Sequence, residues 1–260
     1  MNLNLNNKNA LVCGSTAGIG KATAIALADE GVNVTLVARN REKLKEVLSE
    51  LSEGGKHSYI VADFSNPRDL QEQVIKFVDQ FHGFHILVNN SGGPRSGEIL
   101  TASLVEFENA FTQHLKCSHV LAQSTIPFMK DEGFGRIINI ISTSVKEPIP
   151  GLGVSNTIRG AVGNWSKTLA TEVGQFGITV NNVLPGFTET ERLNEIINIK
   201  ADKEGTSFEE MAEIMKGYSP SKRFAKPEET AKVITFLASE AASYINGINV
   251  PVDGGRTKSL

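Results

Sequence analysis

A glycine-rich turn near the N-terminus has the residue types and the spacing that bind a phosphate. It reads Gly-Ser-Thr-Ala-Gly-Ile-Gly over residues 14–20, directly after the apolar run at 10–13. Glycine has no Cβ, so the backbone can adopt positive φ and approach a phosphate closely. A helical pattern follows at once and ends at Gly31, and a helix N-terminus presents unpaired N–H groups to an anion. The turn therefore predicts a nucleotide pyrophosphate site, although its spacing G-x-x-x-G-x-G differs from the commoner G-x-G-x-x-G. The candidate phosphate-binding residues are Gly14, Ser15, Thr16, Gly18, Ile19 and Gly20.

The rest of the chain must hold this turn in place, and its hydrophobic pattern predicts strands that alternate with helices. We expect strands at 10–13, 32–38, 59–62, 85–88, 136–141, 178–183 and 248–252. We expect helices at 19–30, 44–51, 67–81, 103–129, 154–173 and 227–238. Residues 187–220 are charged and lack one clean periodicity, so we interpret them as an irregular, partly helical excursion. Alternation of this kind is typical of a parallel sheet covered by helices. The predicted fold is a single α/β domain over 1–260, a Rossmann doubly wound parallel sheet.

The composition argues against several other classes of protein. With 260 residues and 40% hydrophobic content, the chain can bury a full core. The net charge of −3, without a basic stripe, argues against nucleic-acid binding. Because no stretch approaches the roughly 20 apolar residues of a membrane helix, and the N-terminus lacks a signal peptide, we expect a cytoplasmic protein without membrane contact. We also expect no metal, since Cys13 and Cys117 lack zinc-ligand spacing and His57, His82, His85 and His119 form no cluster.

Five motifs in this order resemble the short-chain dehydrogenase/reductase family along nearly the whole chain. The glycine turn is similar to that family's T-G-x-x-x-G-I-G, with Cys13 in place of the threonine. The other four are Asp63, the run 89–92 (similar to N-N-A-G), Pro185-Gly186 and the run 252–255. The nearest resemblance is to β-ketoacyl-carrier-protein reductase-like members. It implies a dinucleotide across the carboxyl ends of the first and fourth strands, and a homotetramer with helices 103–129 and 154–173 in an interface. The further cofactor-binding residues that it implies are Asp63, Phe64, Asn90, Ser91, Gly92, Arg159, Pro185, Gly186 and Thr188.

The active site that this resemblance implies is incomplete. The family combines an asparagine, a serine and a Tyr-x-x-x-Lys pair. Ser142 fits the serine, whereas Ser155 and Arg159 stand where the tyrosine and the lysine belong. His114 stands at the position of the asparagine. The chain therefore resembles a divergent subgroup of the family in which the tyrosine is missing.

These substitutions change the chemistry that the site can perform. A ketone reductase delivers hydride to carbon and a proton to oxygen, and the family's lysine lowers the pKa of the tyrosine from about 10 toward neutrality. Spacing by four keeps Ser155 and Arg159 on one helix face, and arginine keeps a positive charge that can hold ribose hydroxyls. A serine hydroxyl is a far weaker acid, but it could pass on a proton from His114, whose imidazole titrates near neutral pH. Alternatively, His114 fills a polar hole at a helix kink. Ser144, Lys146 and Tyr218 are further candidates for the site.

The end of the second strand bears on the choice of cofactor. An acidic residue there binds the ribose 2′-hydroxyl of NAD. Here the strand ends in Val37-Ala38 and Arg39 follows, and an arginine can hold the 2′-phosphate of NADP. We therefore expect NADP(H) in preference to NAD(H).

Two kinds of function remain open from the sequence. The first is an NADP(H)-dependent oxidoreductase that acts on a small hydroxyl or carbonyl substrate, for which a 3-oxoacyl thioester is one candidate. The second is a non-catalytic NADP(H)-binding sensor or scaffold. The substrate pocket is expected from residues 187–220, as a lid, and from the loops at 93–101 and 143–153.

Overall fold

Seven parallel strands form the centre of the molecule. The computed structural model describes residues 2–81 and 83–259. The strands run in the order β3-β2-β1-β4-β5-β6-β7, and every neighbouring pair is parallel. Their bounds are β1 Asn9–Cys13, β2 Asn33–Ala38, β3 Ser58–Val61, β4 Ile86–Asn89, β5 Gly135–Ile140, β6 Ile178–Pro185 and β7 Asn249–Val252. The predicted doubly wound parallel sheet is therefore confirmed.

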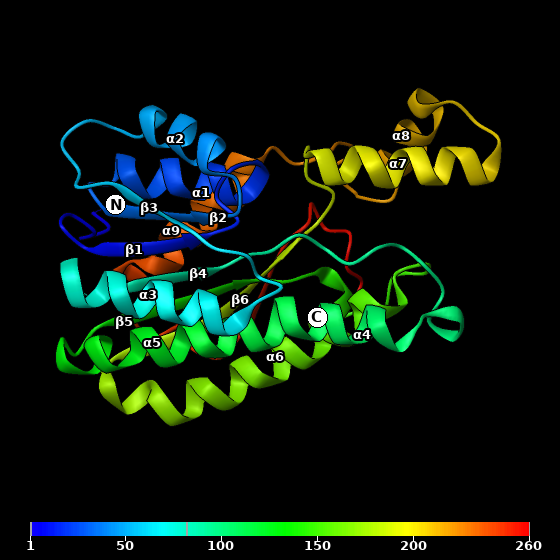
Figure 1. Ribbon diagram of the computed structural model, residues 1–260. Helices are drawn as coiled ribbons and strands as arrows, with labels where there is room; N and C mark the ends of the chain where they lie inside the picture. Colours follow the sequence, from blue (N-terminus) through cyan, green and yellow to red (C-terminus); the bar gives the residue numbers. More distant parts are fainter. Residues whose placement is uncertain (1, 82, 260) are drawn as a thin grey trace.

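Helices cover both faces of this sheet (Figure 1). One layer consists of α1 (Gly18–Asp29), α2 (Arg41–Glu50) and α9 (Pro227–Ala238), and the other of α3 (Pro67–Phe81), α5 (Cys117–Asp131) and α6 (Gly153–Val173). Strand residues alternate between the layers because successive side chains of a strand point to opposite faces. In β1, Ala10 and Val12 pack into the core under α1, whereas Leu11 and Cys13 pack into the core under α5. A strand buried on both sides reads as a continuous apolar run, which is why these strands were visible in the sequence.

The helix expected over 103–129 is divided by a π-helical turn. It consists of α4 (Leu104–Phe111), the π turn Thr112–Lys116, and α5. The Ser118 hydroxyl donates a 2.6 Å hydrogen bond to the carbonyl oxygen of His114, inside this turn. Single π turns are frequent at functional sites. The expected helical segment is present, with the π turn at the place where the sequence analysis considered a kink, and His114 within this turn is buried.

Residues 187–220 are more regular than the sequence indicated. They form two helices, α7 (Glu191–Glu204) and α8 (Phe208–Gly217), which extend beyond the carboxyl ends of the strands (Figure 1). Thr190 caps α7, and Ser207 starts α8 with a capping box. The pair has a small core of its own that includes Leu193 and Met215. The interpretation as an irregular excursion was therefore wrong, because short helices that pack mainly on each other show little periodicity.

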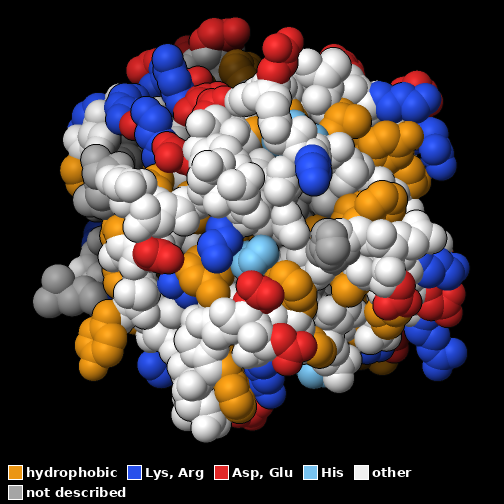
Figure 2. Space-filling model, turned by 90° about the vertical axis from the view of Figure 1, so that its left-hand side faces the viewer, with side chains coloured by type: hydrophobic (Ala, Val, Ile, Leu, Met, Phe, Trp, Pro, Cys, Tyr) orange, Lys and Arg blue, Asp and Glu red, His pale blue; other side chains and the backbone are white. Residues whose placement is uncertain are grey.

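The side away from α7 and α8 carries charges of both signs. Seen from there, Lys and Arg side chains lie among Asp and Glu side chains (Figure 2). Within the described part of the chain, no helix is long and apolar enough to cross a membrane.

Candidate active site

A cleft of about 1090 Å³ opens at the carboxyl ends of the strands. Its wall includes Gly14 after β1, Asn90 after β4, Ile141 after β5 and Gly186 after β6. The strand order reverses between β1 and β4, so the chain leaves these two strands toward opposite faces of the sheet and a crevice remains between them. This is the place in the fold where the sequence predicted the cofactor.

The glycine turn forms one end of the cleft from closely packed backbone. A Cβ on Gly14 would lie 2.8 Å from Asn90 Nδ2, and a Cβ on Gly20 would lie 2.1 Å from the carbonyl oxygen of Gly14. Ala17, the N-cap of α1, provides no side-chain cap, and the first turn of α1 carries no acidic residue. The N–H groups of this helix end are therefore free to bind an anion, which fits the predicted pyrophosphate.

The predicted cofactor-binding residues mostly reach the cleft. Those on its wall are Gly14, Thr16, Gly18, Ile19, Arg39, Asp63, Phe64, Asn90, Ser91, Gly92, Arg159, Pro185, Gly186 and Thr188. Gly20 and Ser15 lie outside it. Ser15 is fully buried, and its Oγ accepts a 3.0 Å hydrogen bond from the Val37 N–H. Its side chain therefore fastens the glycine turn to β2 instead of facing the cleft.

Two basic side chains lie where β2 ends. Arg39 is exposed and Lys43, four residues later on α2, lines the same end of the cleft. Asn40 between them caps α2, accepting hydrogen bonds from the Glu42 and Lys43 N–H groups. This corner fits a dianionic 2′-phosphate better than a ribose hydroxyl. The sequence analysis missed Lys43, although its spacing from Arg39 could have indicated it.

Ser142, Ser155 and Arg159 form the opposite wall of the cleft. Ser142 follows β5, and its Oγ accepts a 3.1 Å hydrogen bond from the Ser144 N–H, which leaves its own O–H free to donate. Arg159 is buried, and its Nη1 donates a 2.7 Å hydrogen bond to the Ile140 carbonyl oxygen. Burial, together with the charge of Arg192, lowers the pKa of Arg159 to about 10, so the guanidinium is still charged at neutral pH. Its charge therefore acts directly on whatever lies in the cleft.

His114 lies behind this wall in a cavity of about 10 Å³, which Ser91 and Arg159 also line. Its Nδ1 is 2.7 Å from Ser91 Oγ. Burial and the nearby Arg159 charge hold the pKa of His114 well below its usual value, so the imidazole is neutral at neutral pH. Because the hydrogen bond joins His114 to Ser91 and not to Ser155, the expected relay to Ser155 needs at least one further group between them.

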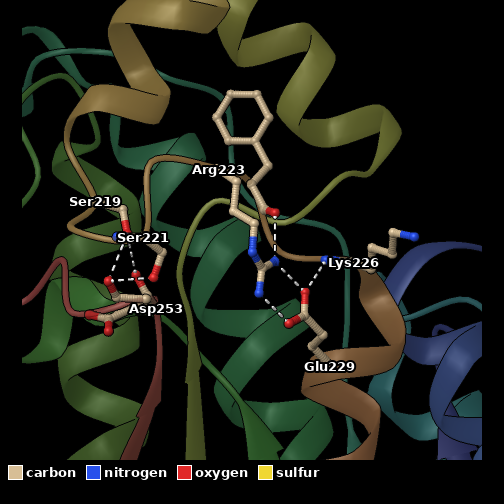
Figure 3. A network of polar contacts seen from close by, with 8 residues as sticks. Ser219, Ser221, Arg223, Lys226, Glu229 and Asp253 are labelled. Carbon is tan, nitrogen blue, oxygen red and sulfur yellow. Dashed lines mark hydrogen bonds and ion pairs between the residues drawn. The ribbon is translucent and has the colours of Figure 1, made fainter.

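The segment that carries α7 and α8, which the sequence analysis expected to act as a lid, is held at both ends. At its start, Arg192 Nη2 donates a 2.6 Å hydrogen bond to the Pro94 carbonyl oxygen, across the cleft. At its end, the Ser219 and Ser221 hydroxyls donate to the carbonyl oxygen of Gly254, next to Asp253 (Figure 3). The guanidinium of Arg223 binds both carboxylate oxygens of Glu229 at 2.6 Å (Figure 3). The segment that carries α7 and α8 is therefore fixed at both ends beside the cleft, which residues of α7 line.

Comparison with known proteins places this arrangement in a family. Residues 14–257 match the family model described as enoyl-(acyl carrier protein) reductase. The chain is 31% identical over 259 residues to the NADPH-dependent reductase BacG of Bacillus subtilis, which covers 98% of this chain and 100% of that protein. It is 33% identical over 258 residues to the 3-oxoacyl-(acyl-carrier-protein) reductase of Aquifex aeolicus, and this match covers 98% of this chain and 99% of that protein. The chain belongs to the short-chain dehydrogenase/reductase family.

A solved structure supports the same assignment. L-Sorbose reductase from Gluconobacter frateurii, determined with NADPH and L-sorbose, superposes with a TM-score of 0.94 at 32% identity over 100% of both chains. These relatives are all named reductases. As a short-chain dehydrogenase/reductase, the chain is an oxidoreductase.

The other candidates from the sequence, Ser144, Lys146 and Tyr218, are not among the residues that line the cleft. Tyr218 is half exposed at the end of α8, its ring 6.4 Å from that of Phe187. The thiols Cys13 and Cys117 are free and buried. In the described residues, no three His, Cys, Asp or Glu side chains gather as metal ligands; His82 lies outside those residues.

Proposed function

We propose that this protein uses NADPH to reduce a carbonyl compound, as a divergent member of its family with Ser155 and Arg159 in place of the tyrosine and the lysine. NADPH, when bound, supplies the hydride. The observation that carries the proposal is that Ser142, Ser155 and Arg159 share one cleft with the glycine turn and with Arg39. A cofactor on the turn and a substrate against the opposite wall would therefore meet.

Three features support NADPH as the cofactor. The glycine turn packs tightly on itself and on Asn90, and it brings the uncapped N-terminus of α1 to the cleft, where its N–H groups can bind a phosphate. Arg39 and Lys43 supply positive charge at the end of β2. The Bacillus relative is named an NADPH-dependent reductase, and the Gluconobacter reductase was solved in complex with NADPH.

The wall formed by Ser142, Ser155 and Arg159, here called the polar wall, would activate the carbonyl by binding its oxygen. The Ser142 and Ser155 hydroxyls donate hydrogen bonds to this oxygen, and the Arg159 charge stabilises the negative charge that develops on it as the carbon receives hydride. Fixed donors and charges of this kind are often the largest contribution to catalysis. Ser155 then transfers its proton to the alkoxide and regains one from water. Because a serine hydroxyl is a weak acid, we expect slow turnover.

The lid supports an acyl chain as part of the substrate. Leu152, Phe187, Leu193 and Ile196 add apolar side chains to the cleft that Ser155 and Arg159 also line. We propose 3-oxoacyl thioesters as the substrate class, and we expect kcat/KM to rise with chain length by a few-fold per added CH₂, since burying one contributes about 0.8 kcal/mol.

The test is NADPH oxidation with simple ketones, ketoses and 3-oxoacyl thioesters of several lengths. We expect slow turnover that is best with the thioesters and is lost in Arg159→Met. Greater turnover with ketoses would refute the substrate class. Tight NADPH binding without turnover of any carbonyl would favour the non-catalytic sensor or scaffold.

We also infer that copies of the chain associate, as the family resemblance implied for a tetramer. Leu104 and Val105 of α4 are 79% and 60% exposed, which is unusual for large apolar side chains that stay in contact with water. Light scattering should give a multiple of the 28.1 kDa chain mass, and a monomer at micromolar concentration would refute the association.

A further inference from the structure

Four asparagines stand side by side on four neighbouring strands. The backbone register pairs Asn89 with Asn139, Asn139 with Asn182, and Asn182 with Asn249. Their amides are bonded in one direction. Asn89 Nδ2 donates to Asn139 Oδ1 at 2.8 Å, Asn139 Nδ2 to Asn182 Oδ1 at 3.1 Å, and Asn182 Nδ2 to Asn249 Oδ1 at 2.8 Å. We call these four residues the asparagine ladder.

The ladder ends at the small cavity behind the cleft. Asn89 Oδ1, His114 Nε2 and Arg159 Nε all belong to residues that line this cavity, and each of the three buried atoms lacks a hydrogen-bond partner in the described part of the chain. A buried polar atom without a partner is costly, so three around one cavity indicate that something bridges them.

The chemistry of the three atoms fixes the direction of the ladder. A guanidinium N–H can only donate, and an amide oxygen can only accept. The observed ladder presents an acceptor, Asn89 Oδ1, to the cavity that holds Arg159 Nε–H. A reversed ladder would place the Asn89 NH₂ there and bring two donors together.

The cavity, at about 10 Å³, is close to the smallest volume that holds one water molecule. Such a water would accept from Arg159 Nε–H and donate to Asn89 Oδ1, with a second proton left for His114 Nε2. The guanidinium charge favours the same arrangement, because the lone pair of an imidazole is its negative end and turns toward a cation. The proton of the neutral ring is then on Nδ1, which donates to Ser91 Oγ across 2.7 Å.

We propose that His114 orients the hydroxyl of Ser91, already expected as a cofactor-binding residue, so that this hydroxyl donates a hydrogen bond to the bound cofactor or substrate. In this proposal His114 is a positioning residue: its Nδ1–H occupies the Ser91 oxygen, so the Ser91 O–H turns toward the cleft that Ser91 lines. The asparagine ladder and Arg159 set this tautomer through one water. Ser91 and His114 are also two departures from the family motifs quoted above, and they contact each other.

The decisive experiment is ¹⁵N NMR of the histidine-labelled protein without ligand at neutral pH, with His114→Asn to identify the signals. We expect a neutral His114 ring with its proton on Nδ1. A proton on Nε2 would overturn the proposal. This measurement needs no turnover, so it can fail or succeed independently of the proposed activity.

Variants at the two ends of the asparagine ladder test its role in setting the tautomer of His114. Asn89→Leu removes the acceptor from the cavity, and we expect a mixture of the two His114 tautomers. Asn249→Ala at the far end is the matched control and should leave the tautomer unchanged. An unchanged tautomer in folded Asn89→Leu would refute the role of the ladder. A crystal structure of the unmutated protein should show one water between Asn89, His114 and Arg159. A cavity without this water would also refute the role of the ladder.

Ser91 itself is tested by ligand binding. Ser91→Ala should weaken NADPH binding or lower kcat/KM by about 3- to 10-fold, the effect of one neutral hydrogen bond. Ser91→Thr keeps a hydroxyl and should restore most of this loss. A Ser91→Ala protein with unchanged values, or a threonine variant that fails to recover them, would contradict the proposal.

Discussion

The glycine turn and the polar wall line the same cleft but are built differently. The turn consists of backbone packed against backbone, so that a Cβ on Gly20 would lie 2.1 Å from the Gly14 carbonyl oxygen. The wall consists of the side chains of Ser142 after β5 and of Ser155 and Arg159 on α6, and Arg159 Nε has no hydrogen-bond partner in the described residues. We infer that such a turn tolerates little change, whereas side chains of the wall can be exchanged with less effect on the fold. On this inference, the family's cofactor motifs can coexist with the altered catalytic set that we propose.

The double variant Ser155→Tyr/Arg159→Lys tests this contrast with the largest expected effect. It returns the family's acid and its lysine to positions whose spacing is already right, and general acid catalysis contributes about 10²- to 10⁴-fold in rate. Reduction of a simple ketone should increase by an amount in this range in steady-state assays. Thr157→Tyr/Arg159→Lys, with the phenol on the exposed side of α6, is the control and should show no gain. If both proteins are equally slow, the wall does not accept exchanged side chains as we infer.

Gly20→Ala should disturb the glycine turn, the part of the cleft that is built from backbone. The new Cβ would meet backbone that cannot move independently, and overpacking typically costs 1–3 kcal/mol, so we expect NADPH affinity to fall by up to about 100-fold. Gly160→Ala in α6, where a Cβ meets nothing within 4 Å, is the matched control. Fluorescence titration with NADPH measures both. Unchanged affinity in Gly20→Ala would show that the turn is not the cradle.

Arg39→Asp should narrow or reverse the preference for NADPH over NADH. Loss of one charge-assisted contact is worth about 1.5 kcal/mol or more, or roughly tenfold in affinity. Arg41→Asp, two residues further along at the start of α2 and outside the cleft wall, controls for the change in net charge. Equal affinity of the unmutated protein for the two cofactors would remove the basis for this prediction.

The smallest expected effect concerns acid stability. Burial holds the pKa of His114 well below its ordinary value of about 6.5, so the unfolded chain binds the proton more readily. Below that pH the unfolded state gains protons that the folded state does not, and stability falls as the pH decreases. His114→Asn should make this decrease shallower in urea unfolding measured at several acidic pH values. His85, whose pKa is lowered by burial as well, should keep part of the slope. An identical slope in both proteins would mean that His114 is not protonated on unfolding.

Much of the fold followed from the sequence because its signals are local. Apolar runs of strand length mark β1 to β7, and the glycine turn precedes α1 as expected. Two features did not follow from the hydrophobic pattern, the π turn at 112–116 and the regularity of α7 and α8, and they have a common cause. In both places the backbone conformation depends on hydrogen bonds and packing that the hydrophobic periodicity of the sequence does not reveal. The caps at Thr190 and Ser207 were readable signals that the sequence analysis did not use.

The sequence by itself determined which residue types gather at the cleft, since motifs that follow parallel strands meet at one edge of the sheet. Only the tertiary structure decided which atoms pair there. Ser15 turns away to β2, His114 bonds to Ser91 across 23 positions, and Asn89 meets Asn139 across 50. The physical reason is that hydrophobic patterning and turn sterics act between near neighbours in the chain. Side-chain hydrogen bonds, by contrast, depend on the register of strands that whole helices separate.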